Sequence, residues 1–128
     1  MDDAALLEGF DAVTLQAFPH EDHVRTVFLQ LRAHDRSSAL AAVRTGIQRM
    51  AERNGNPGAY HETRTVAWFR LIADAATRST AANSHEFLAE NPQFARRDLL
   101  DDYYAEGALL DPRARTEFVE PSRAPLPD

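Results

Sequence analysis

Apolar residues recur at helical spacing through the first half of the chain. After Pro19, apolar positions i, i+3, i+4 and i+7 predict a helix that ends near residues 33–35. These positions are Val24, Val27, Phe28 and Leu31. Asp35 or Ser37 can cap a second helix, which keeps the same spacing up to the break at residues 54–58. That break, Asn-Gly-Asn-Pro-Gly, is the clearest in the chain.

A third long helix is predicted from Tyr60 or His61 to about Thr77. Its inward positions are Ala67, Trp68, Leu71, Ile72 and Ala75, and Val66 and Phe69 widen the apolar surface. Such a broad apolar face suits a central helix.

Shorter elements flank these three helices. They are a short helix and an irregular connection within residues 3–18, a helix from Asn83 or Ser84 to the stop at Asn91-Pro92, a helix over the apolar positions of residues 94–104, and a helix from Asp111-Pro112 to about Phe118 or Val119. Residues 120–128 contain three prolines and predict an extended tail. No strand alternation appears. The sequence therefore predicts an all-α protein with a single domain over residues 1–128, a compact bundle of three long helices with shorter N- and C-terminal helices.

Composition narrows the function classes. A formal net charge of −6 argues against nucleic acid as a partner, because phosphate binding needs clustered positive charge. With no cysteine, any metal site must use His, Asp, Glu or water. No apolar segment reaches membrane-spanning length, and the acidic start does not resemble a signal peptide. We therefore expect no membrane association and a cytoplasmic protein.

Three histidines are predicted to face inward at two helix starts. His20 and His23 lie at the start of the first long helix, and His61 lies at the start of the third. In an up-down-up bundle these two helix starts share one end, so the three imidazoles could meet there. His34 and His85 fall outside the apolar stripes and are expected at the surface.

The histidines allow two kinds of chemistry. Three neutral imidazoles can hold a divalent transition metal such as Zn²⁺, with Glu62 as a less favoured ligand. The positive ends of the helix dipoles disfavour a cation, however, and equally suit metal-free proton transfer to or from an anionic small organic substrate. The catalytic candidates are His20, His23 and His61, and the substrate-binding candidates are Arg64, Thr65, Trp68 and Tyr103.

The preferred hypothesis is a small-molecule enzyme of the lyase, isomerase or hydrolase type, with or without a metal. One alternative is a non-catalytic ligand-binding or protein-interaction module with structural histidines, and another is a metal-binding protein without catalysis. Arg64 is predicted to face inward and so to need a carboxylate or ligand partner. Asp22 and Arg25 are predicted to form a solvated pair on the outer side of their helix.

Three motifs resemble a family of small uncharacterised bacterial helical proteins. They are Phe18-x-His20-x-Asp22-His23-Val24-Arg25, Tyr60-His61-Glu62-Thr63, and Ala114-Arg115-x-x-Phe118-Val119-Glu120-Pro121. Members of that family often read Phe-His-His-x-Asp-His at the first motif, so Pro19 stands in place of one imidazole. The resemblance implies that both histidine motifs and the C-terminal segment form one unit, and it assigns no reaction.

Overall fold

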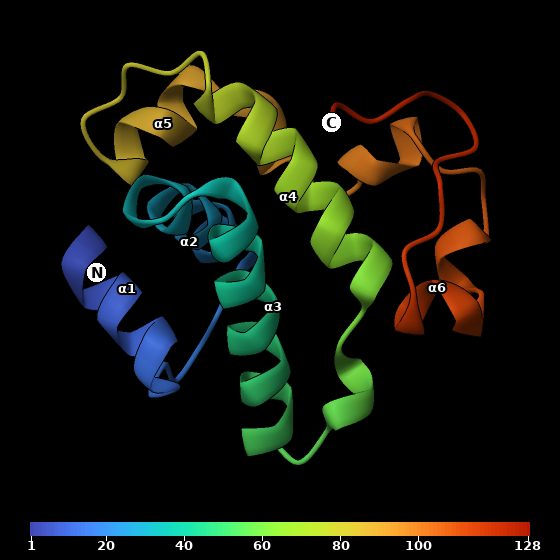
Figure 1. Cartoon of the computed structure of the whole chain (residues 1–128), viewed down its shortest axis with the longest axis horizontal. Helices are drawn as coiled ribbons and strands as arrows, with labels where there is room; N and C mark the ends of the chain where they lie inside the picture. Colours follow the sequence, from blue (N-terminus) through green and yellow to red (C-terminus); the bar gives the residue numbers. More distant parts are fainter.

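The computed structural model describes residues 1–128, and its regular secondary structure consists of helices only (Figure 1). Its α-helices are α1 (Asp3–Ala12), α2 (His20–Ala33), α3 (Arg36–Arg53), α4 (Glu62–Ala76), α5 (Ser84–Glu90) and α6 (Pro112–Thr116). Its 3₁₀ turns are η1 (Pro57–Ala59), η2 (Pro92–Ala95), η3 (Leu99–Asp102) and η4 (Ala108–Leu110). The all-α prediction is confirmed. None of the helices combines the length and apolar character that a membrane span requires.

Polar side chains cap most of the helix starts. The side chain of Asp2 accepts a hydrogen bond from the first turn of α1, and Asp35, Asn83 and Asp111 do the same for α3, α5 and α6. Each cap satisfies an N–H group that has no partner within its helix. Pro19 precedes α2 and provides no side-chain cap, so the first N–H groups of α2 remain without one.

Helix α2 is enclosed by the other helices. Every residue from Val24 to Gln30 is buried, and α2 contacts α1, α3, α4 and α5. Figure 1 shows α1 and α4 on opposite sides of the pair formed by α2 and α3. Apolar side chains from all of these helices form one continuous hydrophobic core. The central position that the sequence suggested for residues 61–77 therefore belongs foremost to α2.

Helix α1 packs closely on α3 at Gly46. A Cβ atom at Gly46 would lie 2.2 Å from Cζ of Phe10. The Phe10 ring is 1% exposed and stacks on Phe18, with ring centroids 5.5 Å apart. The aromatic ring therefore has little room to withdraw, and the contact depends on the missing side chain at Gly46.

We expect Gly46→Ala to lower the free energy of unfolding by about 1–2 kcal/mol, because overpacking costs about 1–3 kcal/mol and alanine returns up to about 1 kcal/mol of helix propensity. Urea denaturation measures the change. Thr45→Ala, at an exposed position of the same helix, should stay within about 0.5 kcal/mol of the parent. Phe10→Leu should relieve part of the loss in the Gly46→Ala background. Fully additive losses would contradict this explanation.

The predicted helix over residues 94–104 does not form. Two 3₁₀ turns, η2 and η3, stand there, separated by extended backbone at Arg96. The side chain of Arg96 pairs with Asp98 and Asp102, which closes a polar turn at the surface. The turn lets Phe94 and the apolar residues of η3 enter the core from two separate points. Helical spacing among the apolar residues could not reveal this interruption.

The C-terminal segment packs along the body of the protein beside α4 (Figure 1). Helix α6 ends at Thr116, before the predicted Phe118 or Val119, because Glu117 adopts an extended conformation. Residues 117–128 contain no helix. The Tyr104 hydroxyl donates to the carbonyl oxygen of Val119 at 2.7 Å, and the carbonyl oxygen of Tyr103 accepts from two tail amides. The extended tail predicted from the prolines is held by these hydrogen bonds.

Candidate functional site

His20 is fixed in one orientation at the first residue of α2. Its Nε2 lies 2.7 Å from the carbonyl oxygen of Phe94, and its ring meets Trp68 edge-on with ring centroids 4.7 Å apart. A carbonyl oxygen only accepts hydrogen bonds, so Nε2 carries the proton of the neutral ring. Nδ1 then keeps its lone pair and has no partner in the protein. This nitrogen can accept a proton or a hydrogen bond.

A pocket of about 300 Å³ lies beside this imidazole. Its lining comes from the first turn of α2, from α5, from η2 and from single residues next to η2. The lining residues are His20, Glu21, Leu88, Asn91, Phe94, Ala95 and Arg97. Phe94 is buried and Leu88 is half-buried, so they form an apolar wall, whereas Glu21 and Arg97 are exposed. The pocket therefore combines an imidazole, a carboxylate, a guanidinium and an apolar surface.

His23 lies one turn after His20 and is neutral. Its ring packs against Phe18 with centroids 5.6 Å apart, and its Nε2 atom is buried without a hydrogen-bond partner. Burial and, to a smaller degree, the neighbouring His20 lower the pKa of His23 to about 4. His23 therefore places no positive charge behind His20 at neutral pH.

Both ring nitrogens of His61 are engaged in structural hydrogen bonds. Nδ1 accepts from the backbone N–H of Arg64 at 3.1 Å and so caps α4, and Nε2 donates to the carbonyl oxygen of Leu109 at 2.8 Å. Burial lowers the pKa of His61 below its ordinary value. Its imidazole links α4 to η4 and has no free nitrogen for a metal or a substrate.

The structure brings His20 and His23 together and places His61 apart from them. His20 contacts Trp68, which lies seven residues beyond His61 and so about 10 Å further along α4. No group of three His, Cys, Asp or Glu side chains is placed to hold a metal ion. The predicted meeting of three imidazoles at one end of the bundle therefore gives way to a pair of histidines on α2 and a separate capping histidine on α4.

The other candidates of the second motif also have structural contacts. Glu62 accepts two hydrogen bonds from Arg44, at 3.0 and 2.9 Å, and one from the Tyr60 hydroxyl. Burial alone would raise the pKa of Glu62, but these hydrogen bonds outweigh it and lower the pKa. The Thr65 hydroxyl donates to the carbonyl oxygen of His61 at 2.9 Å. The carboxylate and the hydroxyl therefore stabilise the start of α4.

Two further predicted substrate-binding residues lie away from the pocket lining. Arg64 is exposed, so the prediction that it faces inward was wrong. Tyr103 is half-buried and holds the C-terminal tail through its carbonyl oxygen. Trp68 is buried and contacts His20 from the core side, which makes it a support for the imidazole.

Thr63 joins the second motif to the C-terminal segment. The residue is 0% exposed, and its hydroxyl oxygen lies 2.6 Å from the carbonyl oxygen of Ala114 and 2.9 Å from that of Glu117. The same oxygen accepts from the backbone N–H of Val119 at 3.1 Å. Two of the three motifs that carry the family resemblance are thus in direct contact.

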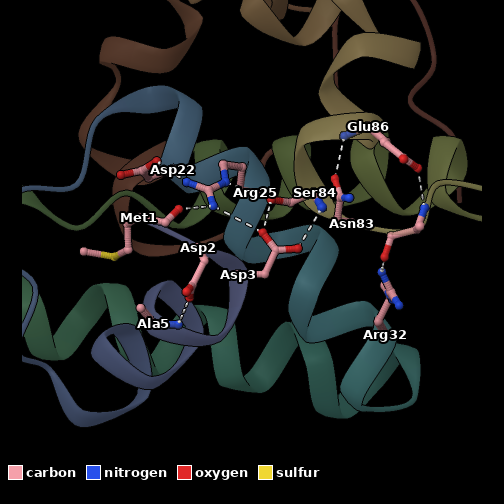
Figure 2. A network of polar contacts seen from close by, with 11 residues as sticks. Met1, Asp2, Asp3, Ala5, Asp22, Arg25, Arg32, Asn83, Ser84 and Glu86 are labelled. Atoms are coloured by element: carbon pink, nitrogen blue, oxygen red, sulfur yellow. Dashed lines mark hydrogen bonds and ion pairs between the residues drawn. The ribbon is translucent and has the colours of Figure 1, made fainter.

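Arg25 is buried and Asp22 is half-buried, contrary to the solvated pair predicted from the sequence. Arg25 is 3% exposed and donates to Asp22, Asp3, the Ser84 hydroxyl and the carbonyl oxygen of Met1 (Figure 2). Ser84 in turn donates to Asp3 through both its hydroxyl and its backbone N–H. Burial alone would raise the pKa of Asp3, but the hydrogen bonds from Ser84 and Arg25 lower it. This network ties α1, α2 and α5 together.

Most of the pocket lining was not among the sequence candidates. Leu88, Asn91, Phe94, Ala95 and Arg97 lie more than 60 residues after His20, on or next to α5 and η2. The helix stop at Asn91-Pro92 was visible in the sequence, but its position beside His20 depends on how α5 packs on α2. His34 and His85 are exposed, as expected.

Comparisons with known proteins find no relationship for this chain: no family model matches it, and no curated protein or solved structure matches it. The family resemblance of the three motifs stays a prediction, and the site must be interpreted from its own geometry.

Proposed function

We propose that the pocket beside His20 binds a small organic molecule and that His20 exchanges a proton with it. The observation that carries this proposal is the hydrogen bond from Nε2 to the Phe94 carbonyl oxygen, which orients the ring of this pocket-lining residue and leaves Nδ1 without a protein partner. A base that is held by a second group through its other nitrogen is a frequent arrangement for general acid–base catalysis. In this proposal α2, α3 and α4 are the bundle of long helices, and the pocket lies where α2 meets α5 and η2.

The surroundings of His20 favour proton transfer. The Phe94 carbonyl oxygen can stabilise the imidazolium that forms when Nδ1 accepts a proton, and the carboxylate of Glu21 lines the same pocket. The neutral state of His23 avoids repulsion from a second cation. These features support a lyase, isomerase or hydrolase type of step, in which a proton leaves or joins the substrate.

The alternative is a binding module in which the histidines have no chemical role. The double engagement of His61 favours that interpretation for the second motif, since its imidazole serves to fasten α4 and η4. The free Nδ1 of His20 has no such structural explanation. The two proposals therefore differ in what His20 does.

A base-dependent elimination reaction tests whether His20 transfers a proton or has no chemical role. The probe 5-nitrobenzisoxazole loses its carbon-bound proton to a base while its N–O bond breaks, which releases a coloured cyanophenolate. We expect the protein to accelerate this reaction and His20→Gln to reduce the rate at least about tenfold, because a positioned base contributes about 10²–10⁴-fold. His85→Gln, at an exposed position outside the pocket, is the control. Equal rates for the parent and His20→Gln would refute proton transfer by His20.

A further inference from the structure

Two opposite charges line the His20 pocket without any protein partner. Neither Glu21 nor Arg97 takes part in an ion pair or a side-chain hydrogen bond, although both line the same cavity. Their sequence neighbours behave differently. Asp22 pairs with Arg25, and Arg96 pairs with Asp98 and Asp102. Other exposed charges, such as Glu106 and Arg64, also lack a partner, but Glu21 and Arg97 carry opposite charges and line the same cavity.

We infer that the ligand of this pocket is a small zwitterion, an α-amino acid with an apolar side chain. Glu21 is positioned to bind the ammonium group, Arg97 the carboxylate, and the wall of Leu88, Phe94 and Ala95 the side chain. This inference rests on the proposed function because it concerns the same pocket. It adds the class of ligand, which the proton chemistry of His20 does not determine.

Charge complementarity favours the zwitterion over ligands with a single charge. A monoanion would be attracted by Arg97 but repelled by Glu21. A simple amine, which is a cation, would be attracted by Glu21 but repelled by Arg97. Each unit charge interacts with a charge about 4 Å away by about 1 kcal/mol in water and by more at a protein surface. A ligand that carries both charges satisfies both residues and has no repulsive contact.

Three matched probes test the inference: L-leucine, 4-methylpentanoate, which lacks the ammonium group, and 3-methylbutylamine, which lacks the carboxylate. Dissociation constants come from NMR titration of the full chain, with the ring nitrogens of His20 as the reporter. We expect leucine to bind about tenfold more tightly than either of the other two, a difference that corresponds to about 1.4 kcal/mol.

Substitutions of the two charged residues should change the preference in opposite ways. Glu21→Gln should remove most of the preference for leucine over 4-methylpentanoate, and Arg97→Gln should remove most of the preference over 3-methylbutylamine. Glu106→Gln and Arg64→Gln, at exposed positions outside the pocket, should leave both preferences unchanged. Because Glu21 and Arg97 are exposed, these variants should fold as the parent does.

The outcomes distinguish this inference from the proposed function. If 4-methylpentanoate binds as tightly as leucine, or if none of the probes shifts the His20 resonances at millimolar concentration, the zwitterion inference is wrong. Proton transfer by His20 is judged separately, by the effect of His20→Gln on the elimination reaction. A His20-dependent elimination together with equal binding of leucine and 4-methylpentanoate would keep the proposed function and reject the amino-acid ligand.

Discussion

Replacing Arg25 with methionine will lower the free energy of unfolding by about 3 kcal/mol, the lower end of the range for breaking a buried ion pair, because Asp3 and Asp22 are 24% and 23% exposed. Methionine retains the aliphatic part of the side chain but removes the guanidinium that donates to Asp3, Asp22, Ser84 and the Met1 carbonyl oxygen. The carboxylates would stay partly buried without their cation. Thermal and urea denaturation should both report the loss.

A double-mutant cycle separates the ion pair from simple loss of packing. Asp3→Asn removes a carboxylate that Arg25 neutralises, so the double variant should be more stable than the sum of the single changes predicts. Arg78→Ala is a surface control, since Arg78 is 66% exposed and forms only an i,i+4 pair with Asp74. It should cost no more than about 0.5 kcal/mol. A similar cost for Arg25→Met and Arg78→Ala would show that the buried network contributes little.

The burial of Arg25 could not be predicted from the sequence, whereas several helix starts could. Helix starts could be predicted because a cap depends on neighbouring residues only. Asp111 caps the helix expected of it, and Asp35 and Asn83 are the caps among the two candidates at each of the other two starts. The orientation of charged side chains could not be predicted from the sequence. Arg25 lies on a side of α2 that α1 and α5 cover, whereas Arg64 lies on a side of α4 that stays exposed. Only the packing of distant elements decides between these environments.

The candidate site was predictable to the same limited extent. Periodicity placed His20 and His61 toward the interior, and His61 is indeed buried. Its partners, however, are a local backbone N–H and a carbonyl oxygen 48 residues later in the chain. His20 likewise meets a carbonyl oxygen of η2, 74 residues away. Backbone carbonyl groups are the same at every position, so the sequence contains no signal for these contacts.

The second large effect concerns pH. We expect acidification from pH 7 to pH 4.5 to lower the free energy of unfolding by about 2 kcal/mol through His23 alone. The pKa of His23 is about 4 in the folded protein against an ordinary value of 6.5. Between these values the unfolded chain binds the proton more strongly than the folded protein does. The stabilisation that neutral His23 gives to the folded protein is therefore fully present above pH 6.5 and is lost as the pH falls toward 4.

His23→Leu identifies the source of this pH dependence. Leucine cannot titrate, so the variant should lose about 2 kcal/mol less than the parent between pH 7 and pH 4.5, whatever its stability at pH 7. Urea unfolding at both pH values measures the difference, with His85→Gln as the exposed control.

A smaller slope of the same sign should persist in His23→Leu, because burial also lowers the pKa of His61. Carboxyl groups with a lowered pKa, such as Asp3, stay ionised down to more acidic pH and leave this window to the histidines. Equal losses in the parent and His23→Leu would mean that His23 is protonated in the folded protein near pH 6.5, and its Nε2 would then need a partner or solvent that the buried position does not provide.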